Sequence, residues 1–274
     1  MSKIPVSILI TTKNEEHNIA RCLRSITGFA QIIVIDSHSS DKTCEIARGL
    51  GAEIVLYQWD GAYPKKRGWC LENLNIAHDW VFWVDGDEAL TPELMDEIRN
   101  LFKSEPREAG YFVRGRYVFN GIELRYGLQN NKIALFNRHK MEFPVINDLD
   151  IEDMGEIEGH YQPVIKVGSS GAIGQLRAYL LHYAYEDEKK WEARHIRYAN
   201  WEAHMNKRGA WAKDPIWRRE MLKKWVRKSA FRPYIVFLYS YLIKLGFLDG
   251  AAGYKFAISR KNYCHLIVKT FKAL

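Results

Sequence analysis

The sequence predicts an α/β protein built on a doubly wound, mostly parallel sheet. First, short apolar runs alternate with segments of helical periodicity over about the first hundred residues. Second, residues 80–84 are apolar at every position, which is typical of a central strand covered on both faces. Third, that run ends in Asp85, Asp87 and Glu88, and ligands of such sheets bind at the carboxyl ends of the strands.

The chain begins with a predicted strand followed by a helix. Residues 6–10 form an apolar run of strand length, and the polar turn 11–14 comes next. Residues 19–26 carry apolar side chains at helical spacing, which predicts a helix. We expect Asn14 to cap this helix, with Glu15 at the positive end of the helix dipole.

The same alternation continues to about residue 100. A helix beginning at Thr91-Pro92 closes the series, because proline is favoured at the first helical position. The other elements expected in this part of the chain are strands at 32–35, 53–57 and 80–84 and helices at 41–47 and 64–77.

Polar groups follow three of the predicted strands at the point where each strand ends. They are Thr11 and Thr12, then Asp36, then Asp85 and Asp87. Parallel strands bring these ends to one edge of the sheet, where a nucleotide would meet all of them. Carboxylates this close repel one another unless a cation such as Mg²⁺ or Mn²⁺ lies between them, and such cations bind diphosphates. The alternative interpretation is a solvated acidic turn before the next helix.

The pattern changes after the fourth helix. Residues 111–119 and 132–136 are predicted strands that could pair antiparallel, and 147–160 is a very acidic loop. The simplest interpretation of any one carboxylate in that loop is a solvated surface charge with no role in a site. The apolar run 180–185 contains His182, and a histidine in such a run is more often structural than a ligand.

The C-terminal third is basic and rich in aromatic residues. The formal net charge is +7, and most of the excess lies here. Helices are predicted at 187–207 and 214–229. The apolar stretch 234–243 is shorter than the roughly 20 residues that span a bilayer. It is expected either to lie in a membrane interface or to complete the core as a buried helix. An anionic membrane surface or glycolipid is the expected partner, and no nucleic acid, because no nucleic-acid-binding motif is present.

Several separate stretches resemble one known family in their order and spacing. They are residues 7–15, 34–43, 65–69 and 85–88. On these stretches the chain resembles glycosyltransferase family 2, whose members have the GT-A fold. It is most similar to the bacterial lipopolysaccharide inner-core glucosyltransferases and their relatives, which share the stretches Leu181-His182-Tyr183 and 246–250.

The resemblance implies an enzyme that transfers a sugar, with inversion, from a nucleotide-diphosphate donor, with a UDP-sugar expected, and that uses Mg²⁺ or Mn²⁺. Asp87 would be the direct metal ligand, with Asp85 and His182 beside it. The processive Gln-x-x-Arg-Trp motif is absent, so addition of a single sugar is expected. The implied nucleotide-binding residues are Thr11, Thr12, Asn14, Glu15, Asp36, Arg67 and Asp85.

Two departures from the family pattern concern the site. Many members have two adjacent acids after the second strand, whereas here Asp36 is followed by Ser37. Close relatives carry Val-His-Glu near the acceptor, where this chain reads Gly-Glu-Ile-Glu-Gly-His-Tyr. Glu158 is therefore expected to be the base that deprotonates the acceptor hydroxyl, with Glu156 and Asp153 as alternatives.

These observations predict a catalytic domain over 1–185 that binds the nucleotide-sugar and the acceptor, and a helical membrane-associating or acceptor region over 186–274. The expected acceptor is a cell-surface glycolipid or polysaccharide such as lipopolysaccharide core. No signal-peptide pattern and no paired cysteine spacing is present, so we expect a cytoplasmic protein, peripheral on the inner face of the cytoplasmic membrane.

Two other functions are considered. A nucleotidyltransferase needs similar carboxylates, but no glycine-rich phosphate signature follows the first strand. The second is a catalytically inactive, membrane-bound scaffold of the same fold, against which the intact pair Asp85 and Asp87 argues.

Overall fold

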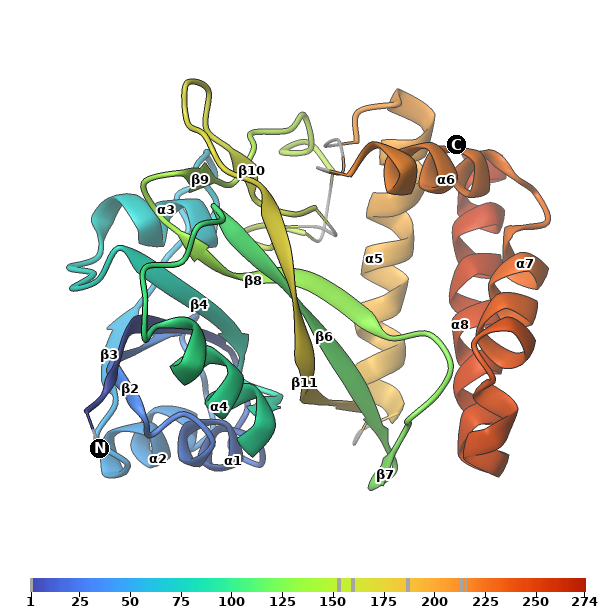
Figure 1. Ribbon diagram of the computed structural model, residues 1–274. Helices are drawn as coiled ribbons and strands as arrows, with labels where there is room; N and C mark the ends of the chain where they lie inside the picture. The colour runs from blue at the N-terminus through green and yellow to red at the C-terminus, as the bar shows by residue number, and fades with distance from the viewer. Residues whose placement is uncertain (1, 152–153, 159–160, 186–187, 212–213, 215) are drawn as a thin grey trace.

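Figure 1 shows the computed structural model, which describes residues 2–151, 154–158, 161–185, 188–211, 214 and 216–274. A large mixed sheet lies beside a group of C-terminal helices. Its strand order is β3-β2-β1-β4-β8-β6-β11-β5, with β7 paired to β6. The strands are β1 (Ile4–Thr12), β2 (Phe29–Asp36), β3 (Glu53–Leu56), β4 (Trp80–Asp85), β5 (Glu88–Leu90), β6 (Gly110–Phe119), β7 (Ile122–Glu123), β8 (Asn130–Asn137) and β11 (Ile173–Tyr185). A separate small pair joins β9 (Met141–Glu142) to β10 (Val164–Ile165).

The N-terminal half is the predicted parallel sheet with helices on both faces. Strand β1 pairs in parallel with β2 and β4, and β2 with β3. Ile8 and Ile10 enter one buried cluster, whereas Leu9 between them enters the other. Because both faces are covered, successive positions of such a strand are apolar, as the sequence shows for residues 8–10 of β1 and 80–84 of β4.

Four helices complete this half of the molecule. The buried apolar side chains of α1 (Ile19–Arg24), α2 (Thr43–Gly49) and α4 (Pro92–Leu101) belong to one core cluster. The buried apolar side chain of α3 (Lys66–Asn73), Cys70, belongs to the cluster on the opposite face. The Thr91 hydroxyl accepts the amide of Leu94 and caps α4, which confirms the predicted start at Thr91-Pro92.

Two local predictions were wrong. Asn14 does not cap α1, because the helix begins only at Ile19; Asn14 has a φ of 58° and its side chain instead accepts the amide of Ser40. The helix expected over 64–77 ends at Asn73. The Gln31 side chain binds the backbone carbonyl of Asn75 and the amide of Ala77, so these groups are satisfied without a helix.

The second half of the sheet is partly antiparallel. Strand β8 lies between β4 and β6 and runs antiparallel to both. The long strand β11 pairs in parallel with β6 and antiparallel with short β5, which places His182 opposite Glu88. The acidic turn after β4 is thereby brought against the Leu-His-Tyr stretch, although the two are distant in sequence.

The C-terminal helices stand side by side at the edge of the molecule away from β3 (Figure 1). They are α5 (Glu188–Arg208), α6 (Trp217–Lys228), α7 (Arg232–Leu238) and α8 (Gly250–Ala273), and a π turn (Tyr239–Ile243) and a 3₁₀ turn (Gly246–Asp249) lie between the last two. Helix α8 packs against both α5 and α7. It was not predicted as a helix, because its apolar residues show little bias to one helical face.

The stretch 234–243 is partly exposed. Ser240 is buried, while Leu242 and Ile243 are 49% and 70% exposed. Within the described residues no single helix is long and apolar enough to cross a membrane. The segments Arg232–Ile243 and Gly246–Ala273 meet the length and composition criteria only as a pair, bent by 72°.

Candidate active site

The predicted polar strand ends do meet at one edge of the sheet. In the register of the parallel strands Thr11 lies beside Asp85, and Thr12 beside Asp36. The Thr11 hydroxyl donates to Asp85 Oδ1 at 2.9 Å. This edge opens on a cavity of about 1820 Å³ whose lining also includes residues of α5 and one of α8. The cavity therefore lies between the sheet and the C-terminal helices.

Asp85 is surrounded by cations. Arg67 approaches Asp85 Oδ1 at 3.1 Å, and Lys132 approaches Oδ2 at 3.0 Å (for both, nitrogen to oxygen). Lys132 also pairs with buried Glu88 at 2.5 Å. Burial by itself would raise the pKa of the Asp85 carboxyl, but the charges of Lys132 and Arg67 outweigh it and hold that pKa well below its usual range. Asp85 is therefore an anion with two fixed partners.

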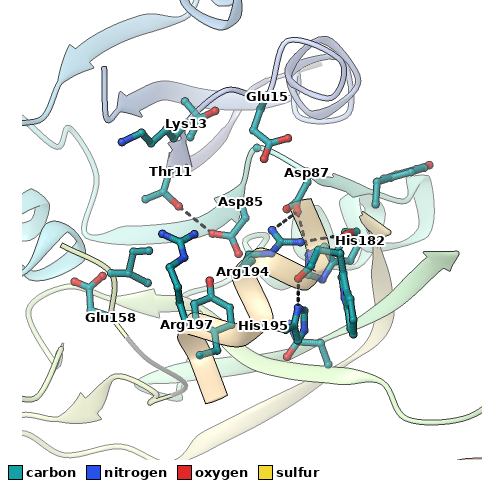
Figure 2. A pocket seen from close by; sticks show the side chains of 18 of the residues that line it. Thr11, Lys13, Glu15, Asp85, Asp87, Glu158, His182, Arg194, His195 and Arg197 are labelled. Atoms are coloured by element: carbon teal, nitrogen blue, oxygen red, sulfur yellow. Dashed lines mark hydrogen bonds and ion pairs between the residues drawn. The ribbon is translucent and has the colours of Figure 1, made fainter. Parts of the chain in front are cut away.

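Asp87 has different partners on the opposite side of the turn. Its Oδ2 lies 3.4 Å from His182 Nε2 and 3.6 Å from an Arg194 nitrogen (Figure 2). Burial alone would lower the pKa of His182, but the charge of Asp87 outweighs it and raises that pKa. The backbone carbonyl of Asp87 accepts the amide of Tyr183, which fixes the turn against β11.

The fit of a divalent cation can be judged from these groups. No cluster of three or more His, Cys, Asp or Glu side chains in the described part of the chain is arranged to hold a metal. Asp87 and His182 nevertheless present a carboxylate and an imidazole to the cavity, and His182 Nδ1 has no hydrogen-bond partner there. Mg²⁺ is commonly held by one or two carboxylates together with substrate phosphates. The residues fit a cation whose remaining ligands come from a diphosphate.

The implied nucleotide-binding residues do not all reach the cavity. Thr11, Thr12, Asn14, Glu15, Arg67 and Asp85 line it. Asp36 does not, because it is fully buried and accepts hydrogen bonds from the Ser39 amide and hydroxyl at 2.7 and 2.5 Å. Ser39 in turn accepts the amide of Asn14. Asp36 thus holds the loop that positions Asn14.

The acidic loop lies at the Arg67 side of the cavity. Glu158 accepts the backbone amide of Arg67 at 2.6 Å, and burial raises its pKa although Arg67 partly offsets this. Glu156 pairs with Lys66 at 2.5 Å and accepts the Ser37 hydroxyl. Figure 2 places Glu158 across the cavity from Asp87. Asp153 lies outside the described residues.

Several residues of the site were not predicted from the sequence. Lys132 pairs with Glu88 of the expected acidic turn beside Asp85, and Arg194 reaches Asp87 from α5. Arg197 also lines the cavity, and Figure 2 shows both arginines extending from that helix toward the two aspartates. The three-residue spacing of Arg194 and Arg197 on a predicted helix was an available signal, because it puts both cations on one face.

Comparisons with known proteins show the family of the chain. The sequence profile described as glycosyl transferase family 2 matches residues 7–153. An uncharacterized glycosyltransferase of Rickettsia typhi is 30% identical over 167 residues, which cover 56% of this chain and 56% of that protein. The lipopolysaccharide core biosynthesis glycosyltransferase LpsC of Rhizobium meliloti is 28% identical over 119 residues, covering 42% of this chain and 43% of LpsC. The chain thus matches about half the length of these relatives.

Among solved structures, the mannosyltransferase PcManGT from Pyrobaculum calidifontis, in complex with GDP-Man and Mn²⁺, superposes with a TM-score of 0.54. The sequences are 15% identical, and the match covers 99% of this chain and 88% of that one. At this identity the likeness shows the GT-A fold alone. The profile match extends from β1 through the turn after β4 and past β9, over more than half of the chain. The chain therefore belongs to glycosyl transferase family 2.

Proposed function

We propose that the protein is a metal-dependent, inverting glycosyltransferase that adds one sugar from a nucleoside diphosphate donor, with a UDP-sugar as the first candidate. The observation that carries this proposal is the pair Asp85 and Asp87 at the carboxyl end of β4, on the wall of a cavity of about 1820 Å³. The family membership supports the reaction class. The general base, the transferred sugar and the inverting mechanism are parts of the proposal.

In the proposed donor complex the nucleoside lies along the ends of β1 and β2. Thr11, Asn14 and Arg67 face it, and the diphosphate lies near Asp87 and His182. A bound Mg²⁺ or Mn²⁺ would offset the charge that develops on the diphosphate as the glycosidic bond breaks. Asp87 and His182 would hold the cation, and Arg194 would be released from Asp87 to contact a phosphate.

The acceptor hydroxyl attacks the anomeric carbon from the face opposite the leaving diphosphate, so the configuration inverts. Its proton passes to a carboxylate, which we assign to Glu158. Two observations support this choice: the side chain lines the cavity, and burial raises its pKa toward the range that suits a base at neutral pH.

The proposed acceptor is a cell-surface glycolipid or polysaccharide, reached at the inner face of the cytoplasmic membrane. The name of LpsC, a lipopolysaccharide core biosynthesis enzyme, supports this class of acceptor. Large exposed apolar side chains on α6 and around α7 support contact with a lipid surface, among them Trp217, Trp225 and Ile243.

Calorimetric titration with UDP, GDP and other nucleoside diphosphates, with and without Mn²⁺, tests the donor site. We expect one of them to bind only with metal, and Asp87→Asn to weaken that binding at least about tenfold, since a charged contact is worth about 1.5–3 kcal/mol. Asp79→Asn is the matched control, because Asp79 precedes β4 at the opposite end of the strand.

The possible results separate the alternatives. If GDP binds in place of UDP, the proposed glycosyltransferase activity stands and the expected donor becomes a GDP-sugar. Metal-dependent binding of nucleoside triphosphates in preference to diphosphates would favour the nucleotidyltransferase. Absence of metal-dependent binding to every nucleotide would support the inactive scaffold and contradict the proposal.

A further inference from the structure

One wall of the cavity is distinct from the donor edge in both composition and origin. It is formed by side chains of β6, β11, α5 and α8 that line the cavity, namely Tyr117, Tyr185, Trp191 and Arg260. Tyr117 stacks on His182 with ring centroids 5.2 Å apart, so this wall adjoins the Asp87 end of the donor site.

The aromatic rings of this wall form a continuous cluster. Tyr117 and Tyr185 are 5.7 Å apart between centroids, and Tyr185 stacks on Trp191 at 5.2 Å. Phe256 of α8 packs against Tyr117 at 5.0 Å and supports the cluster from behind. Rings held in this way offer rigid amphipathic surface to a ligand at little cost in conformational entropy.

The same wall carries hydrogen-bond donors in excess of acceptors. No carboxylate of the described residues pairs with Arg260, whereas Arg194 nearby is paired with Asp87. Trp191 Nε1 is buried and has no hydrogen-bond partner among the described residues. The hydroxyls of Tyr117 and Tyr185 make no hydrogen bond to the part of the chain that the structure describes, and burial raises the pKa of Tyr117 to about 12, so it is protonated at neutral pH.

A partly buried guanidinium without a counter-ion is costly, and a ligand anion would remove that cost. Arg260 of α8 lies 5.2 Å from the ring centroid of Tyr263 and near Tyr117 and Tyr185. Tyr117 in turn stacks on His182, the partner of Asp87. A diphosphate bound near Asp87 and His182 through a cation would leave the Arg260 guanidinium free to contact the acceptor.

We propose that the wall of Tyr117, Tyr185, Trp191 and Arg260 is the acceptor subsite and that it selects a saccharide bearing an anionic group. The rings face the sugar, and Arg260 binds the anion, which is either the carboxylate of a sugar acid or the phosphate of a phosphorylated sugar. This inference rests on the proposed transferase function and adds the chemical class of its acceptor.

The test uses two pairs of probes on the full chain, each with a neutral twin: glucose 6-phosphate with glucose, and a galacturonate disaccharide with its methyl ester. The donor site is first saturated with Mg²⁺ and the nucleoside diphosphate found by titration, so that probes cannot bind there. Affinities are measured by ligand-observed NMR. At least one anionic probe is expected to bind about tenfold more tightly than its neutral twin, because a hydrogen bond to a charged group typically increases affinity by about this factor.

Variants of the wall residues test whether the preference for the anionic probe arises at this wall. Arg260→Gln should abolish the preference while leaving nucleoside diphosphate affinity unchanged, and Arg260→Lys should keep part of it. Lys255→Gln is the control, because it removes the same charge from an exposed position on the same helix. If Arg260→Gln does not fold, Tyr117→Phe and Arg260→Lys are compared with the wild-type protein instead. Each should reduce the preference for the anionic probe.

Two results would overturn the inference. In the first, neither anionic probe binds better than its neutral twin in the wild-type protein. In the second, Arg260→Gln weakens nucleoside diphosphate binding, which would place the guanidinium in the donor site. Failure of the proposed function gives a different result, because no nucleoside diphosphate binds at the first step. The affinities of the probes for the wall are then measured in the absence of nucleotide.

Discussion

At the scale of single residues, the roles of the carboxylates are set by the cations that each one meets. Asp85 lies between Arg67 and Lys132, and those charges keep it ionised. Asp87 faces His182 and Arg194, which belong to other elements. Glu158 accepts the backbone amide of Arg67 at 2.6 Å and lies near the Arg67 charge, and burial raises its pKa. Of these groups, Glu158 is the one whose environment favours accepting a proton.

Glu158→Gln is predicted to lower the turnover rate by about 10²–10⁴-fold with little change in donor affinity, since a general base contributes that much. The wild-type rate should fall as the pH falls through the pKa of Glu158. That pKa lies above the value of about 4.3 for an ordinary glutamate, because burial disfavours the charged form. A pH–rate profile of sugar transfer measures both effects.

Glu156→Gln is the comparison for this prediction, because its carboxylate is already engaged by Lys66 and Ser37. A larger loss of rate for Glu156→Gln than for Glu158→Gln would move the base to Glu156. Full activity in both variants would leave Asp153, or a group outside this loop, as the base.

At the scale of elements, α6 is turned with its large apolar side chains outward. Trp217 and Trp225 are 70% and 65% exposed, while Lys223 pairs with buried Asp214 at 2.6 Å. A surface helix of a soluble protein normally buries its large apolar side chains and exposes its charged ones. Exposed tryptophans together with bases such as Arg218 are typical of a helix that lies in a membrane interface.

Trp217→Ser and Trp225→Ser are each predicted to weaken binding to vesicles of anionic phospholipid several-fold to about tenfold, because burying a large apolar side chain contributes up to about 1.5–3 kcal/mol. Co-sedimentation with anionic and neutral vesicles at low and high salt measures this. High salt should weaken the binding, since part of it is electrostatic.

Leu56→Ser is the control for the vesicle experiment, because Leu56 is 55% exposed on β3, which lies in the N-terminal half of the sheet. Unchanged vesicle binding by both tryptophan variants would contradict the proposed contact. Deleting the whole segment 231–274 is a poorer test, because α8 packs against α5 and Phe256 supports the cavity wall.

At the scale of the whole molecule, one buried carboxylate joins the catalytic half to the C-terminal helices. Asp148 accepts hydrogen bonds from the Tyr63 hydroxyl at 2.7 Å, from Lys65 Nζ at 3.0 Å and from Trp201 Nε1 of α5 at 2.9 Å. Asp148 is 1% exposed, so these contacts exclude water. They hold α5, and with it Arg194, at a fixed distance from the sheet.

Asp148→Asn is predicted to lower the free energy of unfolding by about 3–5 kcal/mol, since it leaves the Lys65 charge buried without a counter-ion. Urea unfolding followed by circular dichroism gives the midpoint and slope for each variant. Asp150→Asn should change stability far less, because the Asp150–Arg208 pair is exposed to solvent. Equal losses for the two variants would contradict a special role for Asp148.

Much of the N-terminal half follows from the sequence alone. The apolar runs define β1, β2 and β4, and the direction of parallel strands puts Thr11, Asp85 and Asp87 at one edge. These features depend on residues that are close in sequence and on a repeat of apolar positions, so a local pattern is enough. Helix ends were less accurate, as Asn14 and the helix at 64–77 show, because side chains from elsewhere, such as Gln31, compete for the backbone groups.

The tertiary structure alone decided which groups complete the site. Lys132 comes from β8, Arg194 from α5 and Arg260 from α8, and each meets the acidic turn or the cavity only after the sheet and helices have packed. The sequence determined where negative charge gathers, because those carboxylates follow one strand. It did not determine which cations neutralise that charge, because electrostatic partners are chosen by distance in space, and distance along the chain does not predict it.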